Sequence, residues 1–341
     1  MRWPGTSPGA NRRRLNDQVV VITGASSGIG REAARQFAGR GSSLVLAARS
    51  EQALRATADE VEQLGGTALV VPTDVAEWPQ VQALAAAARD RFGRVDTWVN
   101  NAVLGSFGSL IDTPIQAVDR VLQVGLRGQI YGAKAVLPMM REQGGGTIIG
   151  VSSVLGIRSI PLYVPYCIAK HGNTALYEGL RVEEQIAGSG IEVTTILPAT
   201  VNTPFYDAVP SFMDTRPPLI PPIYQPSAVA EAILYAAEHP RRRICIGAAG
   251  PMSACQRISP RAVDTVLRGA GRLFVRKRPQ QPDAGQNNHF QPMSGSGATT
   301  GRARMAFPRS RYTRTVGFHP GMARTLAAVA ALAVARRLWK R

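Results

Sequence analysis

The chain has 341 residues, of which 45% are hydrophobic, and a formal net charge of +17 at pH 7. This length accommodates one large α/β domain with additional segments, and the apolar content suffices for a sizeable core. The positive charge lies at the two ends: residues 241–341 carry a net +18 and residues 1–16 a net +4, whereas residues 17–240 carry −5. The basic ends are therefore distinct from an ordinary, mildly acidic middle.

Cysteine and histidine usage argues against disulfide and metal chemistry. The three cysteines are an odd number without C-x-x-C spacing, and the four histidines include no pair at metal-ligand spacing. Both observations suit the reducing cytosol and no metal site. The first 16 residues are rich in Pro, Gly and Arg and lead into no apolar signal core, so we expect a disordered basic arm and a cytoplasmic protein.

From residue 18, short apolar runs alternate with longer stretches of helical periodicity. The runs expected to form strands are Val19–Ile22, Leu44–Ala47, Ala68–Val71, Thr97–Val99, Thr147–Val151, Glu192–Leu197 and Ile244–Ile246. Helical stretches include Arg31–Arg40, Glu51–Leu64 and Trp78–Arg91. This alternation predicts an α/β fold with a doubly wound, mostly parallel sheet (a Rossmann fold) forming a single catalytic domain over residues 17–250. A ligand would bind beyond the carboxyl ends of its strands.

A glycine-rich loop follows the first expected strand and runs straight into a helix. Its sequence is Thr23-Gly24-Ala25-Ser26-Ser27-Gly28-Ile29-Gly30. Glycine lets the backbone turn tightly and approach a pyrophosphate, whose charge the following helix N-terminus stabilises. The spacing differs from the G-x-G-x-x-G of the common dinucleotide fingerprint, so a plain glycine-rich turn is the alternative.

The end of the second strand indicates which dinucleotide binds. An NAD site usually has an acidic residue here to hold the ribose hydroxyls, but this chain reads Leu46-Ala47-Ala48-Arg49. Arg49 offers a cationic fork for a 2′-phosphate, which predicts NADP (NADPH) as the cofactor, with NAD less favoured. The alternative is that Arg49 is a solvated surface residue.

Tyr166 and Lys170 are the candidate catalytic pair. The segment after Pro165 opens a predicted helix at Tyr166, and residues four apart project from one helical face. A nearby ammonium favours the phenolate and so lowers a tyrosine pKa that starts at about 10. A proton donor works best when its pKa is near the operating pH. Tyr163 has Cys167 rather than a lysine four residues on, so Tyr166 is the better candidate.

Four segments surround or follow the catalytic region. Residues 204–226 hold seven prolines and many apolar side chains, which favours a functional lid over a surface excursion that packs its own apolar residues. Residues 251–280 suggest a basic amphipathic helix, and residues 281–320 a low-complexity linker with little order. Residues 321–341 predict an apolar-basic terminal helix, too short in its apolar part to span a bilayer, which needs roughly 20 residues. This helix could lie on an anionic membrane surface, or dock on the domain or on a dimer partner.

Taken together, these motifs resemble those of the short-chain dehydrogenase/reductase family, in particular bacterial members with a basic C-terminal extension. The likeness covers about residues 17–250. In chain order, the matching pieces are T-G-A-S-S-G-I-G at 23–30, Asp74 in Thr73-Asp74-Val75, Asn100-Asn101-Ala102, Ser153 thirteen residues before Tyr166, then Lys170, and the segment from Pro198 to Thr203. The resemblance implies an enzyme that reduces a carbonyl or oxidises the corresponding alcohol with NAD(P), a short-chain dehydrogenase acting on CH–OH donors.

The resemblance also implies a role for each matching residue. Tyr166 would exchange the proton of the substrate oxygen, Lys170 would bind the nicotinamide ribose and lower the tyrosine pKa, and Ser153 would hold the substrate oxygen. Asp74 would bind the adenine amino group, with Val75 beside it. The remaining implied cofactor contacts are Gly24, Ser26, Ser27, Gly28, Ile29, Gly30, Arg49, Asn101, Ala102, Pro198 and Thr203.

Three positions depart from the family pattern. Gly125 stands where the V-N-x-x-G motif has an asparagine, which completes a catalytic tetrad by supporting a water that relays protons to the lysine. The carbonyl that contacts this water is retained, but glycine loosens its helix by about 1 kcal/mol relative to alanine. Val103 replaces a glycine and crowds the nicotinamide side, and Ala199 replaces a glycine after Pro198. We therefore expect a weakened or altered proton relay.

Two functions remain open at this point. The leading one is an active NADP(H)-dependent reductase for a small apolar carbonyl or alcohol, because residues 204–226 are apolar. The alternative is a nucleotide-binding sensor or scaffold with little turnover, which Gly125 and Val103 favour. The resemblance further implies a homo-oligomer. Nucleic-acid binding is not expected, because the basic tail lacks a recognisable reading module.

Overall fold

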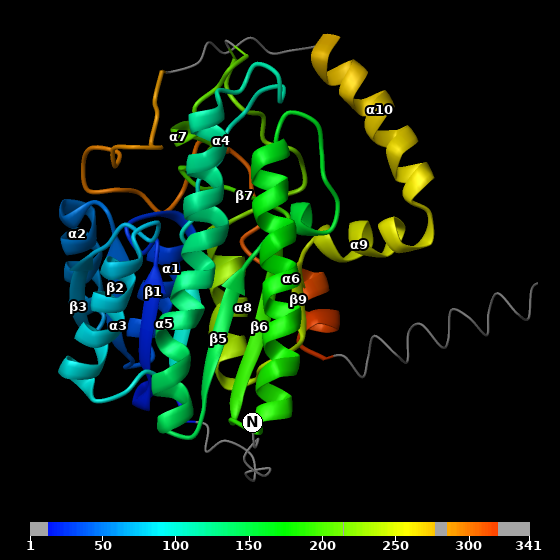
Figure 1. Cartoon of the computed structure of the whole chain (residues 1–341). Helices are drawn as coiled ribbons and strands as arrows, with labels where there is room; N and C mark the ends of the chain where they lie inside the picture. Colours follow the sequence, from blue (N-terminus) through cyan, green and yellow to red (C-terminus); the bar gives the residue numbers. More distant parts are fainter. Residues whose placement is uncertain (1–12, 214, 277–284, 320–341) are drawn as a thin grey trace, which may run out of the picture.

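The computed structural model of the protein describes residues 13–213, 215–276 and 285–319. Its central sheet has seven parallel strands in the order β3-β2-β1-β4-β5-β6-β9 (Figure 1). The strands are β1 Val19–Thr23, β2 Ser43–Ala48, β3 Thr67–Pro72, β4 Thr97–Asn100, β5 Gly146–Val151, β6 Ile191–Pro198 and β9 Arg243–Ile246. Each contains the apolar run from which it was expected, because a parallel sheet is buried on both faces. The prediction of a doubly wound parallel sheet is confirmed.

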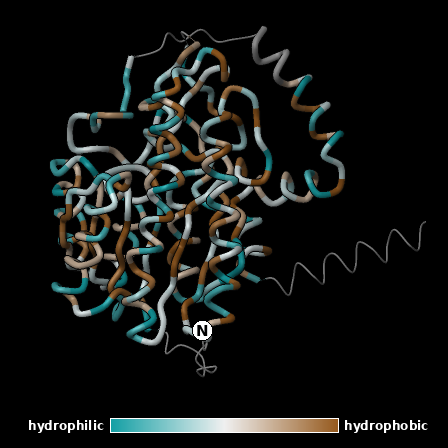
Figure 2. Tube along the Cα trace, viewed as in Figure 1, coloured by the Kyte–Doolittle hydropathy of each residue, from teal (hydrophilic) through white to brown (hydrophobic). Residues whose placement is uncertain are grey.

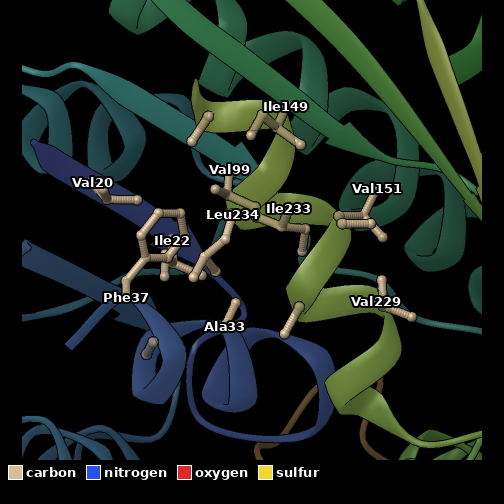
Figure 3. Close-up of a cluster of buried hydrophobic side chains, with 14 of the residues drawn as sticks. Val20, Ile22, Ala33, Phe37, Val99, Ile149, Val151, Val229, Ile233 and Leu234 are labelled. Carbon is tan, nitrogen blue, oxygen red and sulfur yellow. The ribbon is translucent and has the colours of Figure 1, made fainter. Parts of the chain in front are cut away.

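Helices cover both faces of this sheet. One face carries α1 Gly28–Ala38, α2 Glu51–Gln63 and α8 Pro226–Glu238; the other carries α3 Trp78–Phe92, α4 Ile115–Leu122, α5 Gly128–Glu142 and α6 Val164–Ala187. Figure 3 shows Val20 and Ile22 of β1 in the first layer beside Phe37 of α1. Val21, between them, lies in the core of the opposite face. Successive side chains of a strand point to opposite faces, so a continuous apolar run supplies both cores.

The strand order reverses between β1 and β4, the two central neighbours. A parallel sheet of this topology opens a crevice beyond the carboxyl ends of its strands at the point of reversal. The loops after β1, β2, β4 and β5 all end at this edge, and they carry the residues that the sequence singled out. The sheet therefore gathers the candidate site from segments more than 100 residues apart.

The helix that carries Tyr166 and Lys170 differs slightly from the expectation. It begins at Val164 rather than at Tyr166, and Pro165 lies in its first turn. Proline is tolerated there because the first helical N–H groups have no intrahelical partner. A one-turn π-helix, η2 Gln123–Arg127, joins α4 to α5 and contains Gly125.

The proline-rich segment 204–226 forms an irregular excursion with one short helix, α7 Phe205–Ala208. Its far end, β8 Ile223–Tyr224, pairs with β7 Thr200–Val201. The segment therefore returns to its starting point, which places its apolar side chains above the carboxyl edge of the sheet.

Two helices occupy the region where the sequence suggests one basic helix over 251–280. They are α9 Ala249–Ile258 and α10 Pro260–Arg276. The helical conformation is interrupted at Ser259, which has φ −150°. The break follows from Pro260, because the residue before a proline is disfavoured in the helical region. α10 extends away from the body in Figure 1, and Figure 2 shows hydrophilic and hydrophobic residues interspersed along it.

Residues 285–319 pack against the domain, whereas the composition of 281–320 led us to expect little order. Phe307 bridges to Tyr224, and the buried ring of Phe318 stacks on Tyr235 with centroids 4.0 Å apart. The segment ends in a π-helical turn, η4 Thr313–Gly317. A few aromatic and arginine side chains bind the segment to the domain. The average composition of the segment, which is polar, does not reveal these individual contacts.

The two predicted terminal segments are described only in small part. Residues 1–12 and the terminal helix expected over 321–341 lie outside the described residues. Leu15, at the start of the short η1 helix Leu15–Asp17, is buried in the core although the disordered arm was expected to reach residue 16. Of the helices that the structure describes, none has the length and apolar character needed to cross a membrane.

Candidate active site

The glycine loop joins β1 to α1 and requires glycine at two positions for different reasons. Gly24 has φ +70°, a left-handed conformation that side chains disfavour. At Gly30 the conformation is ordinary, but an added Cβ would lie only 2.2 Å from the Gly24 carbonyl oxygen. Gly30 therefore serves close packing of helix on loop, and it does not line the cavity described below.

Asn101 and Ala102, which follow β4, hold the loop from the neighbouring strand. The amide N–H groups of Asn101 and Ala102 donate to Thr23 Oγ1 over 3.0 and 3.2 Å, and Asn101 Nδ2 donates to the Thr23 carbonyl over 3.0 Å. These bonds fix the loop at the switch point of the sheet. Their immediate effect is structural, and both residues also line the cavity.

The opposite end of the site carries a cluster of charges at the ends of β2 and β3. Asp74 forms an ion pair with Arg120 of α4, whose Nε donates to the His289 carbonyl over 2.7 Å. Arg49 donates to the carbonyls of Asn288 and His289 over 2.5 and 2.9 Å. Burial lowers the pKa of Arg49, and the nearby Asp74 carboxylate acts in the opposite direction.

This cluster bears on two details of the sequence analysis. Arg49 is not a solvated surface residue, because it is half-buried and bonded to carbonyls about 240 residues further along the chain. Asp74, the implied adenine ligand, already has a cationic partner in Arg120. Arg120 itself was missed, since a lone arginine in an amphipathic helix gives no signal of the loop that it faces.

Ser153, Tyr166 and Lys170 come together beyond the end of β5. Ser153 caps the short η3 helix, Val154–Gly156, accepting a hydrogen bond from Leu155 N over 3.1 Å, and it is hydrogen-bonded to Tyr166. Lys170 Nζ donates to the Val151 carbonyl over 2.7 Å and lies 5.5 Å from the centre of the Tyr166 ring. The i,i+4 spacing of the helix and the end of the strand thus place the three side chains in one site.

Burial, rather than the lysine, dominates the protonation of this group. It raises the pKa of Tyr166, with a smaller contribution from Tyr206, while the Ser153 hydrogen bond acts in the other direction. Burial also lowers the pKa of Lys170 to about 7. The pKa of Tyr166 is therefore raised, whereas we expected Lys170 to lower it. The reason is that both groups are removed from water, which favours the neutral form of each.

Gly125 and Val103 lie close together in the site. An added Cβ at Gly125 would lie 3.2 Å from Ala169 Cβ and 3.8 Å from Val103 Cγ2. The Gly125 carbonyl accepts a hydrogen bond from Asn173 Nδ2 over 2.9 Å. Asn173 is fully buried one turn after Lys170, and its Oδ1 has no partner among the described residues. This asparagine was missed, although a polar side chain at Lys170+3 on the same helical side is the signal that would have indicated it.

One cavity of about 650 Å³ joins these features. Of the predicted site residues, those that line it are Gly24, Ser26, Ser27, Gly28, Ile29, Arg49, Asp74, Val75, Asn101, Ala102, Ser153, Tyr166, Lys170, Pro198 and Thr203. The departing residues Val103 and Ala199 line it as well. The cavity runs from the charge cluster past the glycine loop to the Ser153–Tyr166–Lys170 group.

The catalytic end of the cavity is apolar. Its walls there include Leu155 and Ile160, together with Phe205, Tyr206 and Ile220 of the proline-rich segment. The Phe205 ring lies 5.5 Å from that of Tyr166, centroid to centroid. Residues 204–226 therefore form one wall of the site, as a lid would.

The donor set of the cavity fits a nicotinamide dinucleotide. Gly28 has φ +54°, and an added Cβ would lie 3.1 Å from Thr203 Cγ2, so the start of α1 is kept open beside the cavity. The N–H groups at a helix start favour a pyrophosphate, and the Arg49 fork suits a phosphate. Among the described residues, no group of three or more His, Cys, Asp or Glu side chains could hold a metal ion.

Comparison with known proteins agrees with this geometry. A sequence model described as short chain dehydrogenase matches residues 18–213. The uncharacterized oxidoreductase YxnA of Bacillus subtilis is 38% identical over 258 residues, which cover 75% of this chain and 72% of YxnA. The uncharacterized oxidoreductase SSP1627 of Staphylococcus saprophyticus is 38% identical over 232 residues, covering 66% of this chain and 92% of that protein.

Solved structures show the same similarity. An alcohol dehydrogenase from the archaeon Thermococcus sibiricus, complexed with 5-hydroxy-NADP, superposes with a TM-score of 0.60 at 28% identity, covering 67% of this chain and 95% of that one. A short-chain type dehydrogenase/reductase from Mycobacterium marinum gives a TM-score of 0.57 at 28% identity, covering 66% and 89%. The chain therefore belongs to the short-chain dehydrogenase/reductase family, oxidoreductases that use NAD or NADP.

Proposed function

We propose that the protein is an NADP(H)-dependent oxidoreductase that interconverts an apolar carbonyl compound and its alcohol. The observation that carries the proposal is the meeting of Ser153, Tyr166 and Lys170 in a cavity that continues, on one side, to a glycine loop and an arginine and, on the other, to apolar walls. A hydrogen-bonding group at the boundary of a polar and an apolar compartment is suited to binding a polar atom of an otherwise apolar molecule.

Each residue of the group has a distinct task. Bound NADPH supplies a hydride to the carbonyl carbon, and in the reverse direction NADP⁺ accepts it. Tyr166 donates its hydroxyl proton to the oxygen that gains the electron pair, and Ser153 donates a hydrogen bond to the same oxygen. Lys170, with a pKa of about 7, can gain or lose a proton near neutrality and so return one to Tyr166.

The raised pKa of Tyr166 keeps its phenol protonated near neutral pH. A phenol that stays protonated near neutral pH is ready to donate, whereas alcohol oxidation needs the phenolate as base. Oxidation activity should therefore rise as the pH increases toward the alkaline range, while reduction should persist at neutral pH.

The preference for NADP rests on Arg49. Its guanidinium has five N–H groups, of which two are bonded to carbonyls, so donors remain for a 2′-phosphate. We expect Arg49→Gln to raise the KM for NADPH at least about tenfold, which corresponds to the loss of one charged hydrogen bond. The KM for NADH should change little. Arg55→Gln is the matched control, because Arg55 is exposed on α2 and forms an ion pair with Glu51 on the same helix. Equal KM changes for the two cofactors would contradict the role of Arg49.

Turnover is tested with purified protein, NADPH and a panel of apolar aldehydes, ketones and quinones. Tyr166→Phe should abolish NADPH oxidation while NADPH still binds. Tyr163→Phe is the matched control, because the Tyr163 hydroxyl finds no hydrogen-bond partner within the described part of the chain. NADPH binding without turnover on any of these substrates, and no difference between wild type and Tyr166→Phe, would contradict the enzyme proposal.

A nucleotide-binding sensor or scaffold is the second candidate. The Gly125 carbonyl, which the family resemblance assigns to a proton-relay water, accepts a hydrogen bond from Asn173. If the relay is lost, the protein would bind NADPH and turn over slowly or not at all, which is the outcome that separates the two candidates. A homo-oligomer and membrane contact through residues 321–341 stay predictions, the latter lying outside the described residues.

A further inference from the structure

A segment outside the part of the chain that matches the family crosses the mouth of the cavity. The match ends at residue 213, whereas residues 285–303 return to the site from the C-terminal side. This segment, shown in orange in Figure 1, lies at the end of the sheet where the strands reach their carboxyl termini. We call residues 286–298 the strap.

The strap contacts the cavity at both ends of the predicted dinucleotide site. At the adenosine end, the carbonyls of Asn288 and His289 accept hydrogen bonds from Arg49. Over the glycine loop, the Ala298 carbonyl accepts one from Gly28 N over 2.9 Å, and the Ser296 carbonyl accepts one from Arg31 over 2.5 Å. Two of these donors, Arg49 and Gly28 N, are ones that the sequence assigns to phosphate groups.

Two side chains anchor the strap to the domain. The buried His289 ring bonds through Nε2 to the Gly105 carbonyl over 2.8 Å, and since a carbonyl only accepts, this nitrogen donates. Arg302, just after the strap, pairs with Asp207 of α7 over 2.6 Å and donates to the Pro217 carbonyl. Both anchors lie on the wall formed by the proline-rich segment or the loop beneath it.

The strap covers the cavity without filling it. Its residues Asn288, Ser294, Ser296 and Gly297 line the cavity from outside, and about 650 Å³ remains beneath. Gly297 fits closely, since an added Cβ would lie 2.3 Å from the Ser26 carbonyl oxygen. The strap is therefore a cover: the residues expected to bind the dinucleotide line open space, although Gly28 N and part of the Arg49 guanidinium are bonded to strap carbonyls.

We propose that the strap is the outer wall of the dinucleotide site and has to lift before the cofactor enters or leaves. This inference rests on the proposed function, since it assumes that a nicotinamide dinucleotide occupies the cavity. The proposal requires that the strap close again over the bound cofactor, so that the His289 and Arg302 anchors are the same with and without it. Weakening an anchor consequently raises the rates of association and dissociation together and leaves the Kd nearly unchanged.

The test uses the full-length protein and stopped-flow fluorescence of NADPH. His289→Ala and Arg302→Gln each remove an anchor, and the loss of one hydrogen bond corresponds to a rise of about fivefold in both exchange rates. Arg314→Gln is the matched control, because Arg314 pairs with Glu231 over 2.6 Å further along the same segment, away from the cavity. Its exchange rates should equal those of the wild type.

The possible results separate the two proposals. Failure of the wild type to bind either NADPH or NADH would overturn the proposed function and the strap together. Binding with dissociation rates within twofold of wild type in both anchor variants would overturn the strap alone. Faster dissociation without equally faster association would overturn the strap proposal too, since the strap would then be a fixed contact. Tighter binding in the variants would also overturn it, because the strap would then compete with the cofactor.

Discussion

Replacing Lys170 with methionine should stabilise the fold while abolishing turnover. Lys170 is 1% exposed, and its Nζ donates a hydrogen bond to the Val151 carbonyl. Methionine has a stem of similar length, fills the same space and brings no charge into the core. Lys170 is thus a residue at which catalysis and stability are expected to conflict.

The magnitude follows from the pKa of this lysine. Burial lowers it from 10.5 to about 7, and one unit corresponds to about 1.4 kcal/mol. At pH 7 the unfolded chain is therefore favoured by about 4 kcal/mol through protonation of Lys170. Losing the bond to Val151 offsets about 1 kcal/mol of the gain on substitution. We expect the free energy of unfolding of Lys170→Met to exceed that of the wild type by about 3 kcal/mol at pH 7.

The dependence on pH identifies the cause. Between pH 7 and 10.5 the unfolded state binds more protons than the folded state, so the wild type gains stability from Lys170 as the pH rises. At pH 10 the protonation effect has fallen to about 1 kcal/mol and cancels the lost hydrogen bond, so the two proteins should be equally stable. Urea unfolding without nucleotide at pH 7, 8.5 and 10 measures this difference. A difference that does not change with pH, or a less stable variant at pH 7, would refute the reasoning.

Two further substitutions test the packing and the relay. Gly150→Ala would place a Cβ 1.8 Å from the Tyr177 ring and should lower the free energy of unfolding by about 2–3 kcal/mol. Gly179→Ala is the control, because no described neighbouring atom lies within 4 Å of an added Cβ there. In the same urea titration it should leave the free energy of unfolding unchanged or raise it by up to about 1 kcal/mol. Asn173→Ala should lower kcat about tenfold and shift its pH profile, with an unchanged KM for NADPH, because the Gly125 carbonyl loses the donor that positions it. An unchanged pH profile would show that Asn173 only fills space.

Much of the fold was readable from local pattern. All seven expected strands are present, because the strands of a parallel sheet are short runs rich in apolar residues, and such runs are visible without knowing their neighbours. The pairing of Tyr166 with Lys170 was equally local, since a helix places residues four apart on one side. The glycine loop was identified by residues that tolerate a left-handed turn and close packing.

The surroundings of these residues depend on segments that meet only in three dimensions. Arg49 binds carbonyls about 240 residues away, and Asp74 binds Arg120 on another helix. The pKa of Tyr166 is raised rather than lowered because burial outweighs every nearby group, and the extent of burial is a property of the assembled walls.

The sequence by itself therefore determined the strands of the central sheet and their order along the chain, and it indicated Ser153, Tyr166 and Lys170 as candidate catalytic residues. Tertiary structure alone decided that a polar C-terminal segment lines the cavity and that Asn173 binds the Gly125 carbonyl. The physical reason is that periodicity and turn chemistry act within a few residues, whereas the partners of a buried donor are chosen by whichever distant carbonyl the fold brings to it.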